Sequence, residues 1–247
     1  NEELRIMTRT DFVPVGWYKV ASAGFNDPNK AYAGFEWSVA DDFRLEQTGR
    51  CFVTMRFEAI RPNPLVRYDC RWTFDDGTVE TGEKIEHVFL RPAMRKVHLE
   101  VRLEGKLLAQ AGQEVHVHPA WDRSLTQAGS AEAFDKAIRE RNLDKAPAED
   151  LVNLFILAEE AERPGWKSRA TIALAANPGR LVDESGDTDF FFDFGRYLQS
   201  AELKKYDEAL ELFSRLAAKP GVNESVRQRA AISQAEMLVK YFGRNDE

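Results

Sequence analysis

The chain has 247 residues, of which 43% are hydrophobic and 30% charged, and its formal net charge is −7. This length allows one large domain or two ordinary ones. The acidic balance argues against nucleic acid as a partner, because phosphate contacts need clustered Lys and Arg. No apolar run approaches the ~20 residues that a membrane-spanning helix needs.

The first 47 residues contain two short stretches with strand character, Gly16–Val20 and Phe35–Val39, with a turn at 26–29 between them. Two interpretations remain open for this segment. It adds early strands to the domain that follows, or it is the remainder of a preceding domain. We expect extra N-terminal strands, so that the first domain covers residues 1–119.

Residues 48–118 alternate between apolar and polar side chains, most clearly in 51–58, 68–74 and 97–103. This period of two predicts strands with one buried face. Turn sequences separate the strands, and their short spacing predicts an antiparallel β-sandwich. Strands 51–57 and 68–74 are expected to pair as a hairpin.

One motif in this region reads Trp72-Thr73-Phe74-Asp75-Asp76-Gly77, followed by His87 and Phe89. Its order resembles a PKD domain, an immunoglobulin-like module with a Trp-x-Phe-Gly-Asp-Gly turn and a His-x-Tyr/Phe step, and the match covers about residues 48–118. Asp75 stands where that family prefers Gly, and Ala93 stands where Gly usually follows Pro. PKD-like modules are usually extracellular or envelope-associated spacers and adhesive units.

The residues of this motif have a structural interpretation. Trp72 and Phe74 fill the core, and Asp76 accepts backbone N–H bonds in the turn. Gly77 supplies a dihedral that other residues avoid, and His87 closes a hydrogen bond over the turn. A cation held by Asp75 and Asp76 is the alternative, but calcium needs six to eight oxygens and a tight turn offers few. We expect no metal, no cofactor and no catalytic residue here.

The two cysteines, Cys51 and Cys70, both lie on inward faces. In the expected hairpin their positions are separated by about 13 Å along the strands, whereas a disulfide needs Cα atoms within ~7 Å. We therefore predict two reduced, buried thiols.

Three histidines share an outward parity. His116 and His118 alternate on one strand, and His98 lies on a neighbouring strand. Imidazoles at this spacing can bind a metal, but no carboxylate or Cys ligand stands beside them in sequence, so a solvated strand edge is the favoured interpretation.

After about residue 119 the apolar spacing becomes helical. Helices are predicted at 131–142, 150–162, 166–176, 189–200, 205–218 and 223–242, with a loop at 177–188. The sequence therefore predicts two domains, a β-sandwich at 1–119 followed by an all-α domain at 125–247.

Residues 190–221 resemble a tetratricopeptide repeat, a family of paired helices whose stacks usually hold peptides or partner proteins. The matching positions are Phe191, Phe194, Gly195, Leu198, Tyr206, Ala209, Phe213 and Pro220. A plain helical bundle is the alternative. Tyr206, Phe213 and Trp121 are candidate interaction residues, although core packing is their first expected role.

The sequence contains none of the common hydrolase, phosphate-loop, metalloprotease or dinucleotide motifs. We expect a non-catalytic binding or scaffold protein that works through protein–protein contacts in the periplasm, the cell envelope or outside the cell. The alternative is a carbohydrate-binding accessory region in which Trp17, Trp37 or Trp121 stacks on sugars, whereas core packing is the usual role of such residues.

Overall fold

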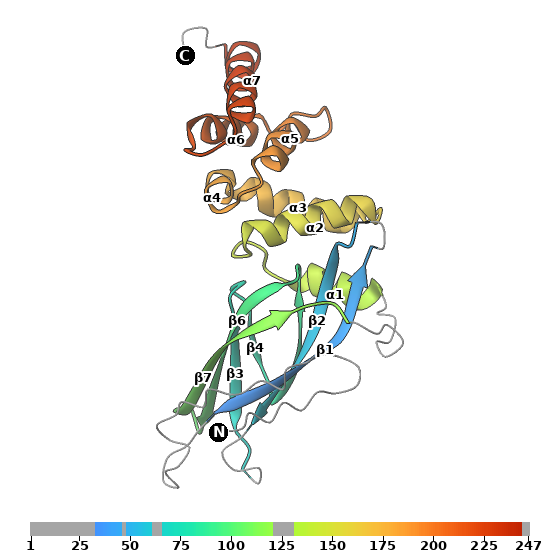
Figure 1. Cartoon of the computed structure of the whole chain (residues 1–247), viewed down its shortest axis with the longest axis vertical. Coiled ribbons are helices and arrows are strands. Elements are labelled where there is room, and N and C mark those ends of the chain that lie inside the picture. The colour runs from blue at the N-terminus through green and yellow to red at the C-terminus, as the bar shows by residue number, and fades with distance from the viewer. Residues whose placement is uncertain (1–32, 46–47, 61–65, 121–130, 244–247) are drawn as a thin grey trace. The chain divides into compact units, whose positions relative to one another are not determined.

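The computed structural model describes residues 33–45, 48–60, 66–120 and 131–243. The chain divides into two compact units, one ending at Lys145 and the other beginning at Ala146. Strands come first along the chain and helices follow (Figure 1). The predicted order of β and then α is therefore confirmed.

The described strands of the first unit form two antiparallel sheets. The three-stranded sheet has the order β1-β2-β5, with β1 (Gly34–Arg44), β2 (Cys51–Ile60) and β5 (Lys84–Phe89). The four-stranded sheet has the order β4-β3-β6-β7, with β4 (Val79–Thr81), β3 (Asp69–Phe74), β6 (Ala93–Leu103) and β7 (Lys106–Val117). The strand expected at 35–39 is part of β1, whereas Gly16–Val20 lies outside the described residues.

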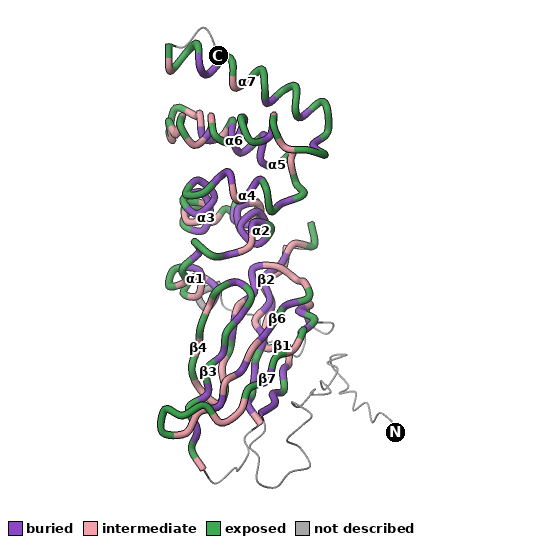
Figure 2. The backbone as a smooth tube through the Cα atoms, turned by 90° about the vertical axis from the view of Figure 1, so that its left-hand side faces the viewer, coloured by how far each residue is buried: buried purple, intermediate pink, exposed green. Residues whose placement is uncertain are grey.

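The inward residues of both sheets contribute to one hydrophobic core. Phe35 and Phe57 of the three-stranded sheet contact Trp72 of the other sheet, with ring centroids 5.3 and 5.7 Å apart. Buried and exposed residues alternate along β3, and Figure 2 shows purple and green segments following one another along the strands. Period-two alternation therefore turns one face of each strand toward the shared core.

The pairing of these strands differs from the expected hairpin. β2 pairs with β1 and β5, whereas β3 pairs with β4 and β6. The prediction that 51–57 and 68–74 are neighbours is wrong. Both strands have a strongly apolar face, and these faces meet across the core instead of lying side by side in one sheet.

Cys51 and Cys70 consequently lie in different sheets. Both are free and buried, so the predicted reduced thiols are confirmed although the register behind that prediction was wrong. Burial raises the pKa of the Cys51 thiol to about 11, an effect that Arg44 opposes and Asp42 reinforces. A thiol in this state is a weak nucleophile, because the thiolate is the reactive form.

Helix α1 (Ala131–Glu140) belongs to the first unit. The ring of Phe134 packs 6.0 Å from the rings of Phe43 and Phe52. Phe52 follows the inward-facing Cys51, so it lies on the opposite side of its sheet, where the alternation calls for a polar residue. The apolar side of α1 is thus covered by a sheet, and the first unit extends beyond the predicted boundary at residue 119.

The second unit contains six helices among its described residues. These are α2 (Ala148–Glu160), α3 (Pro164–Ala176), α4 (Pro178–Glu184), α5 (Thr188–Leu198), α6 (Tyr206–Ala218) and α7 (Glu224–Phe242). Neighbours in sequence pack together, α2 with α3, α5 with α6 and α6 with α7. None of the described helices combines the length and the apolar content that crossing a bilayer requires.

Helix α4 occupies part of the predicted loop at 177–188, which is a correction. The side chain of Asn177 accepts a hydrogen bond from the Arg180 N–H, and Pro178 stands at the first helical position. Asn and Pro in these places start a helix, because Asn caps the free N–H groups and Pro has none to lose. The same residues also end helices, so the sequence alone favoured the wrong assignment.

Candidate functional site: a buried network of charged side chains

The predicted motif residues meet at the hairpin between β3 and β4. Trp72 and Phe74 are buried in the core, and the Trp72 indole N–H donates to the carbonyl of Gly82 at 2.8 Å. The ring of His87, on β5, stacks on Phe74 with centroids 3.8 Å apart and an interplanar angle of 7°. Trp72 and Phe74 each contact the ring of Phe57, with centroids 5.7 and 5.5 Å apart, so the aromatic side chains of the motif are linked through Phe57.

The turn itself has the predicted chemistry. Oδ1 of Asp76 accepts the Thr78 backbone N–H at 2.9 Å. Gly77 has φ +81°, and a Cβ there would lie 2.8 Å from the Cβ of Lys145. Both the backbone conformation and the close approach therefore require glycine. Asp75 does not take up a left-handed conformation, so its departure from the PKD pattern causes no backbone strain.

His87 lies between two carboxylates. Its Nε2 is 2.8 Å from Oδ2 of Asp76, and its Nδ1 is 2.6 Å from Oε1 of Glu80 on β4. Ionised carboxylates only accept hydrogen bonds, so both contacts are made together when both ring nitrogens carry a proton. The histidine thus joins the turn to two strands that belong to different sheets.

Arg141 completes the network from the segment just after α1. Its guanidinium contacts Oδ2 of Asp76 and donates to the carbonyl of Val88 on β5 at 2.5 Å. The side chains of Asp76 and Arg141 are 0% and 7% exposed. This burial matters because a buried carboxylate needs charged donors around it.

The electrostatics of Asp76 follow from these partners. Burial alone would raise the pKa of its carboxyl group, but the hydrogen bond from His87 and the charges of Arg141 and His87 hold that pKa well below its usual range. A general acid needs a pKa raised toward the working pH. The environment of Asp76 acts in the opposite direction, which favours a structural role.

The neighbouring aspartate points to other partners. Oδ2 of Asp75 accepts the Lys96 backbone N–H at 3.3 Å, and Oδ1 lies 3.9 Å from Arg95. Asp75 and Asp76 therefore do not converge on one ion. Within the described ranges, no group of three or more His, Cys, Asp or Glu side chains is placed to hold a metal.

The outward histidines are partly brought together. The rings of His116 and His118 have centroids 5.3 Å apart, and Nδ1 of His118 lies 3.0 Å from the carbonyl of Pro119. His98 pairs with Gly112, four residues away from His116 along β7. His98 lies on β6, His116 on β7 and His118 just after β7. The three imidazoles therefore do not form one cluster.

The candidate interaction residues differ in their burial and in whether the structure describes them. Tyr206 is half-buried, and its ring stacks on Tyr241 with centroids 4.1 Å apart. Phe213 is fully buried beneath Gly195, so it belongs to the core and offers no surface. Trp121 lies outside the described residues, as does Trp17. Trp37 is 8% exposed, which removes it as a sugar-stacking platform.

Two members of the network, Glu80 and Arg141, were not predicted. Glu80 occupies an ordinary polar position of a short strand. Arg141 follows a helix 65 residues from Asp76, and nothing in its local sequence indicates that it reaches the turn. A comparison of the chain with protein-family models, with curated proteins and with solved structures finds no match. The function is therefore inferred from the geometry.

Proposed function

We propose that the protein is a non-catalytic binding or scaffold protein of the cell envelope that works through protein–protein contacts. In this proposal the first unit is an immunoglobulin-like β-sandwich of the PKD kind. The shared core of the two sheets supports this, as does the meeting of Phe74, Asp76 and His87 at the turn. The envelope location depends on the resemblance to PKD-like modules.

The second unit is proposed to be a tetratricopeptide-like stack. Gly195 on α5 supports this, because a Cβ there would lie 2.9 Å from the ring of Phe213 on α6. A small residue that receives a large one at the helix crossing is the packing feature of that family. Such stacks present helical surfaces to partners.

The observation that carries the proposal is the exposed side of α7. Ile232 and Val239 are 60% and 57% exposed, and they lie seven residues apart, on one side of the helix. Ala235 lies between them and is also exposed. Most of α7 appears in green in Figure 2. Exposed apolar side chains gathered on one surface mark interaction sites.

Two partly exposed tyrosines lie elsewhere on the α6–α7 pair, because Tyr241 is nine positions from Ile232 and therefore on the opposite side of α7. Tyr206 and Tyr241 stack on each other at the α6–α7 pair, and Tyr241 is 37% exposed. The α7 surface, defined as Ile232, Ala235 and Val239, is therefore the proposed contact region.

The proposal is tested with the double variant Ile232→Glu/Val239→Glu. Proteins captured from envelope extracts by the full chain and by the variant are quantified by mass spectrometry, and recovered candidates are retested in purified form. At least one purified partner should bind about tenfold or more weakly to the variant, which corresponds to ~1.4 kcal/mol or more.

Ile172→Glu is the matched control, because Ile172 on α3 is 62% exposed and lies outside the α7 surface. It should bind partners as the unaltered chain does. Circular dichroism establishes that all the variants are folded. Recovery of the same proteins by all three chains would show that the α7 surface is not the contact region.

A further inference from the structure

Gly112 stands inside β7, where a glycine weakens the strand. Its backbone does not require glycine, since its φ lies outside the left-handed region and it pairs regularly with His98. The register shift of β6 and β7 lies elsewhere, between Val101 and Arg102. A Cβ at position 112 would have only Nδ1 of His98 within 4 Å, at 3.4 Å. Neither conformation nor packing explains the glycine, and a strand glycine of this kind often marks a place where a ligand or another backbone approaches closely.

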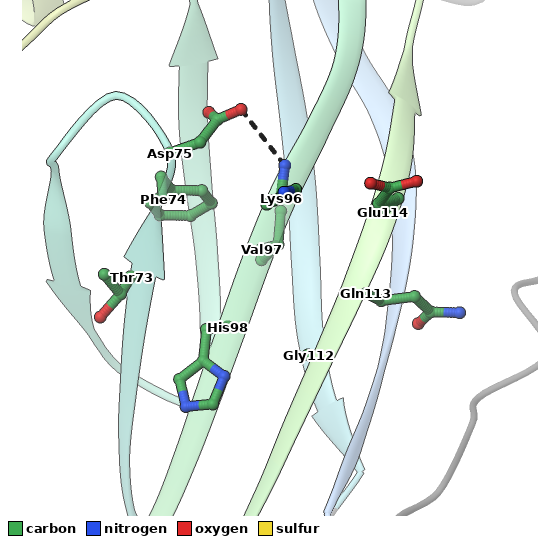
Figure 3. Close-up of a pocket in the computed structure, with 9 residues that line it drawn as sticks. All are labelled: Thr73, Phe74, Asp75, Lys96, Val97, His98, Gly112, Gln113 and Glu114. Carbon is green, nitrogen blue, oxygen red and sulfur yellow. Dashed lines mark hydrogen bonds between the residues drawn. The ribbon is translucent and has the colours of Figure 1, made fainter.

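A hollow of ≈ 470 Å³ lies at this glycine on the outward face of the four-stranded sheet (Figure 3). Thr73 on β3, His98 on β6 and Gly112 on β7 are consecutive partners in one row across the sheet. The missing side chain at the end of this row leaves space beside the His98 ring. We call this space the Gly112 hollow; its polar and charged border is formed by Thr73, Asp75, Lys96, His98 and Glu114.

The groups around the Gly112 hollow are polar and balanced in charge. The hydroxyl of Thr73 can donate and accept a hydrogen bond, as can the neutral imidazole of His98. Lys96 and Glu114 are register partners with opposite charges. Asp75 also lines the hollow, but its carboxylate lies 3.9 Å from Arg95, so neither sign predominates around the space. Aliphatic stems and the bare backbone of Gly112 supply carbon surface between these groups. Such a site suits a ligand with hydrogen-bonding edges, an apolar face and no net charge.

We propose that the Gly112 hollow binds a neutral saccharide. A sugar ring has C–H groups on its faces and hydroxyls around its edge, which matches carbon surface bordered by Thr73, His98, Lys96 and Glu114. An anionic ligand would be repelled by Glu114, and a cationic ligand would be repelled by Lys96. The proposal goes beyond the protein-binding function, because it concerns the first unit and a different class of ligand.

The test is an NMR titration of the full-length chain with cellobiose, chitobiose and maltose. At least one of these sugars should cause saturable shifts of the backbone amides of Thr73, 96–98 and 112–114, with a Kd of about 1 mM, as expected for an open site with few contacts. Gly112→Val fills the hollow and should weaken binding about tenfold or more. Its melting temperature should stay the same or rise, because valine favours strands.

Gln110→Val is the matched control. Gln110 lies two residues away on the same face of β7, outside the hollow, and this variant should keep the affinity. Thr73→Val is a second test, because it removes the hydroxyl at nearly constant volume and should weaken binding about threefold or more. No saturable shift with any of the three sugars would overturn the proposal. So would binding that Gly112→Val leaves intact, or a lower melting temperature for that variant, since the glycine would then have a structural reason.

Discussion

At the level of single residues, the carboxylate of Asp76 has two structural roles in the hairpin. One carboxylate oxygen fixes the turn through Thr78, and the other receives His87 and Arg141. Because this carboxylate is buried, its charge is stable only while these donors stay in place. The loss of one donor costs more than one hydrogen bond, since it leaves a charge unpaired in the core.

Arg141→Ala should therefore destabilise the first unit by about 3–5 kcal/mol, the range found when one member of a buried ion pair is removed. Hydrogen exchange of the β3 and β5 amides, measured in the full chain, reports this change directly. Exchange in α5 and α6, which belong to the second unit, should stay unchanged.

Arg139→Ala provides the comparison for that variant. Arg139 is an exposed residue of α1, only two positions away, and its loss should change the stability by no more than about 0.5 kcal/mol. Equal effects of the two variants would mean that the network contributes nothing particular to stability.

The residues around Asp76 also show how far the sequence could predict this site. The turn chemistry of Asp76 and Gly77 and the hydrogen bond of His87 were predictable, because each depends on nearby positions or on a recognisable order of motifs. Arg141 was not predictable, because its contact with the turn exists only after α1 has packed on the β2 side of the unit.

At the level of helices and strands, alternation predicted burial but not pairing. β2 and β3 each have a buried face, as expected from their period of two. Which strand lies beside which depends on contacts between distant segments, and the alternation contains no information on those. The same limit affects α4, because Asn177 and Pro178 can both end one helix and begin the next.

The crossing of α5 and α6 gives a prediction for these elements. Gly195→Ala places a Cβ 2.9 Å from two carbons of the Phe213 ring, and Phe213 is fully buried. The helices must move apart or the ring must turn, so the variant should lose about 1–3 kcal/mol of stability. Urea unfolding followed by circular dichroism at the helical band measures this loss.

Gly165→Ala is the suitable control, because Gly165 also lies in a helix and an added Cβ there meets nothing within 4 Å. This change should be neutral or should stabilise α3 by up to about 1 kcal/mol, since alanine is the better helix former. A stable Gly195→Ala variant would show that the α5–α6 crossing adapts without cost.

For the whole molecule, the division at Lys145 and Ala146 implies two units with separate cores. The transition from strands to helices falls between Val117 and Ala131, yet α1 belongs with the sheets because Phe134 packs on Phe43 and Phe52. A change of period along the sequence therefore marks a change of secondary structure, but it does not mark where one core ends.

A fragment of residues 146–247 should accordingly fold alone, with helical circular dichroism and one cooperative thermal transition. A longer fragment of residues 125–247 should gain no stability, because Phe134 would have lost the aromatic rings that cover it. A featureless melt of the shorter fragment, or a clearly higher melting temperature of the longer one, would contradict this division.

The two cysteines have a practical consequence for following such transitions. Both lie in the first unit, one in each sheet, and the second unit contains none. Since the Cys51 thiol is enclosed and resists ionisation, an alkylating dye added at neutral pH would modify it only in molecules whose three-stranded sheet has opened. The rate of labelling at Cys51, separated from labelling at Cys70 by peptide mapping, would then report openings of that sheet without any engineered probe.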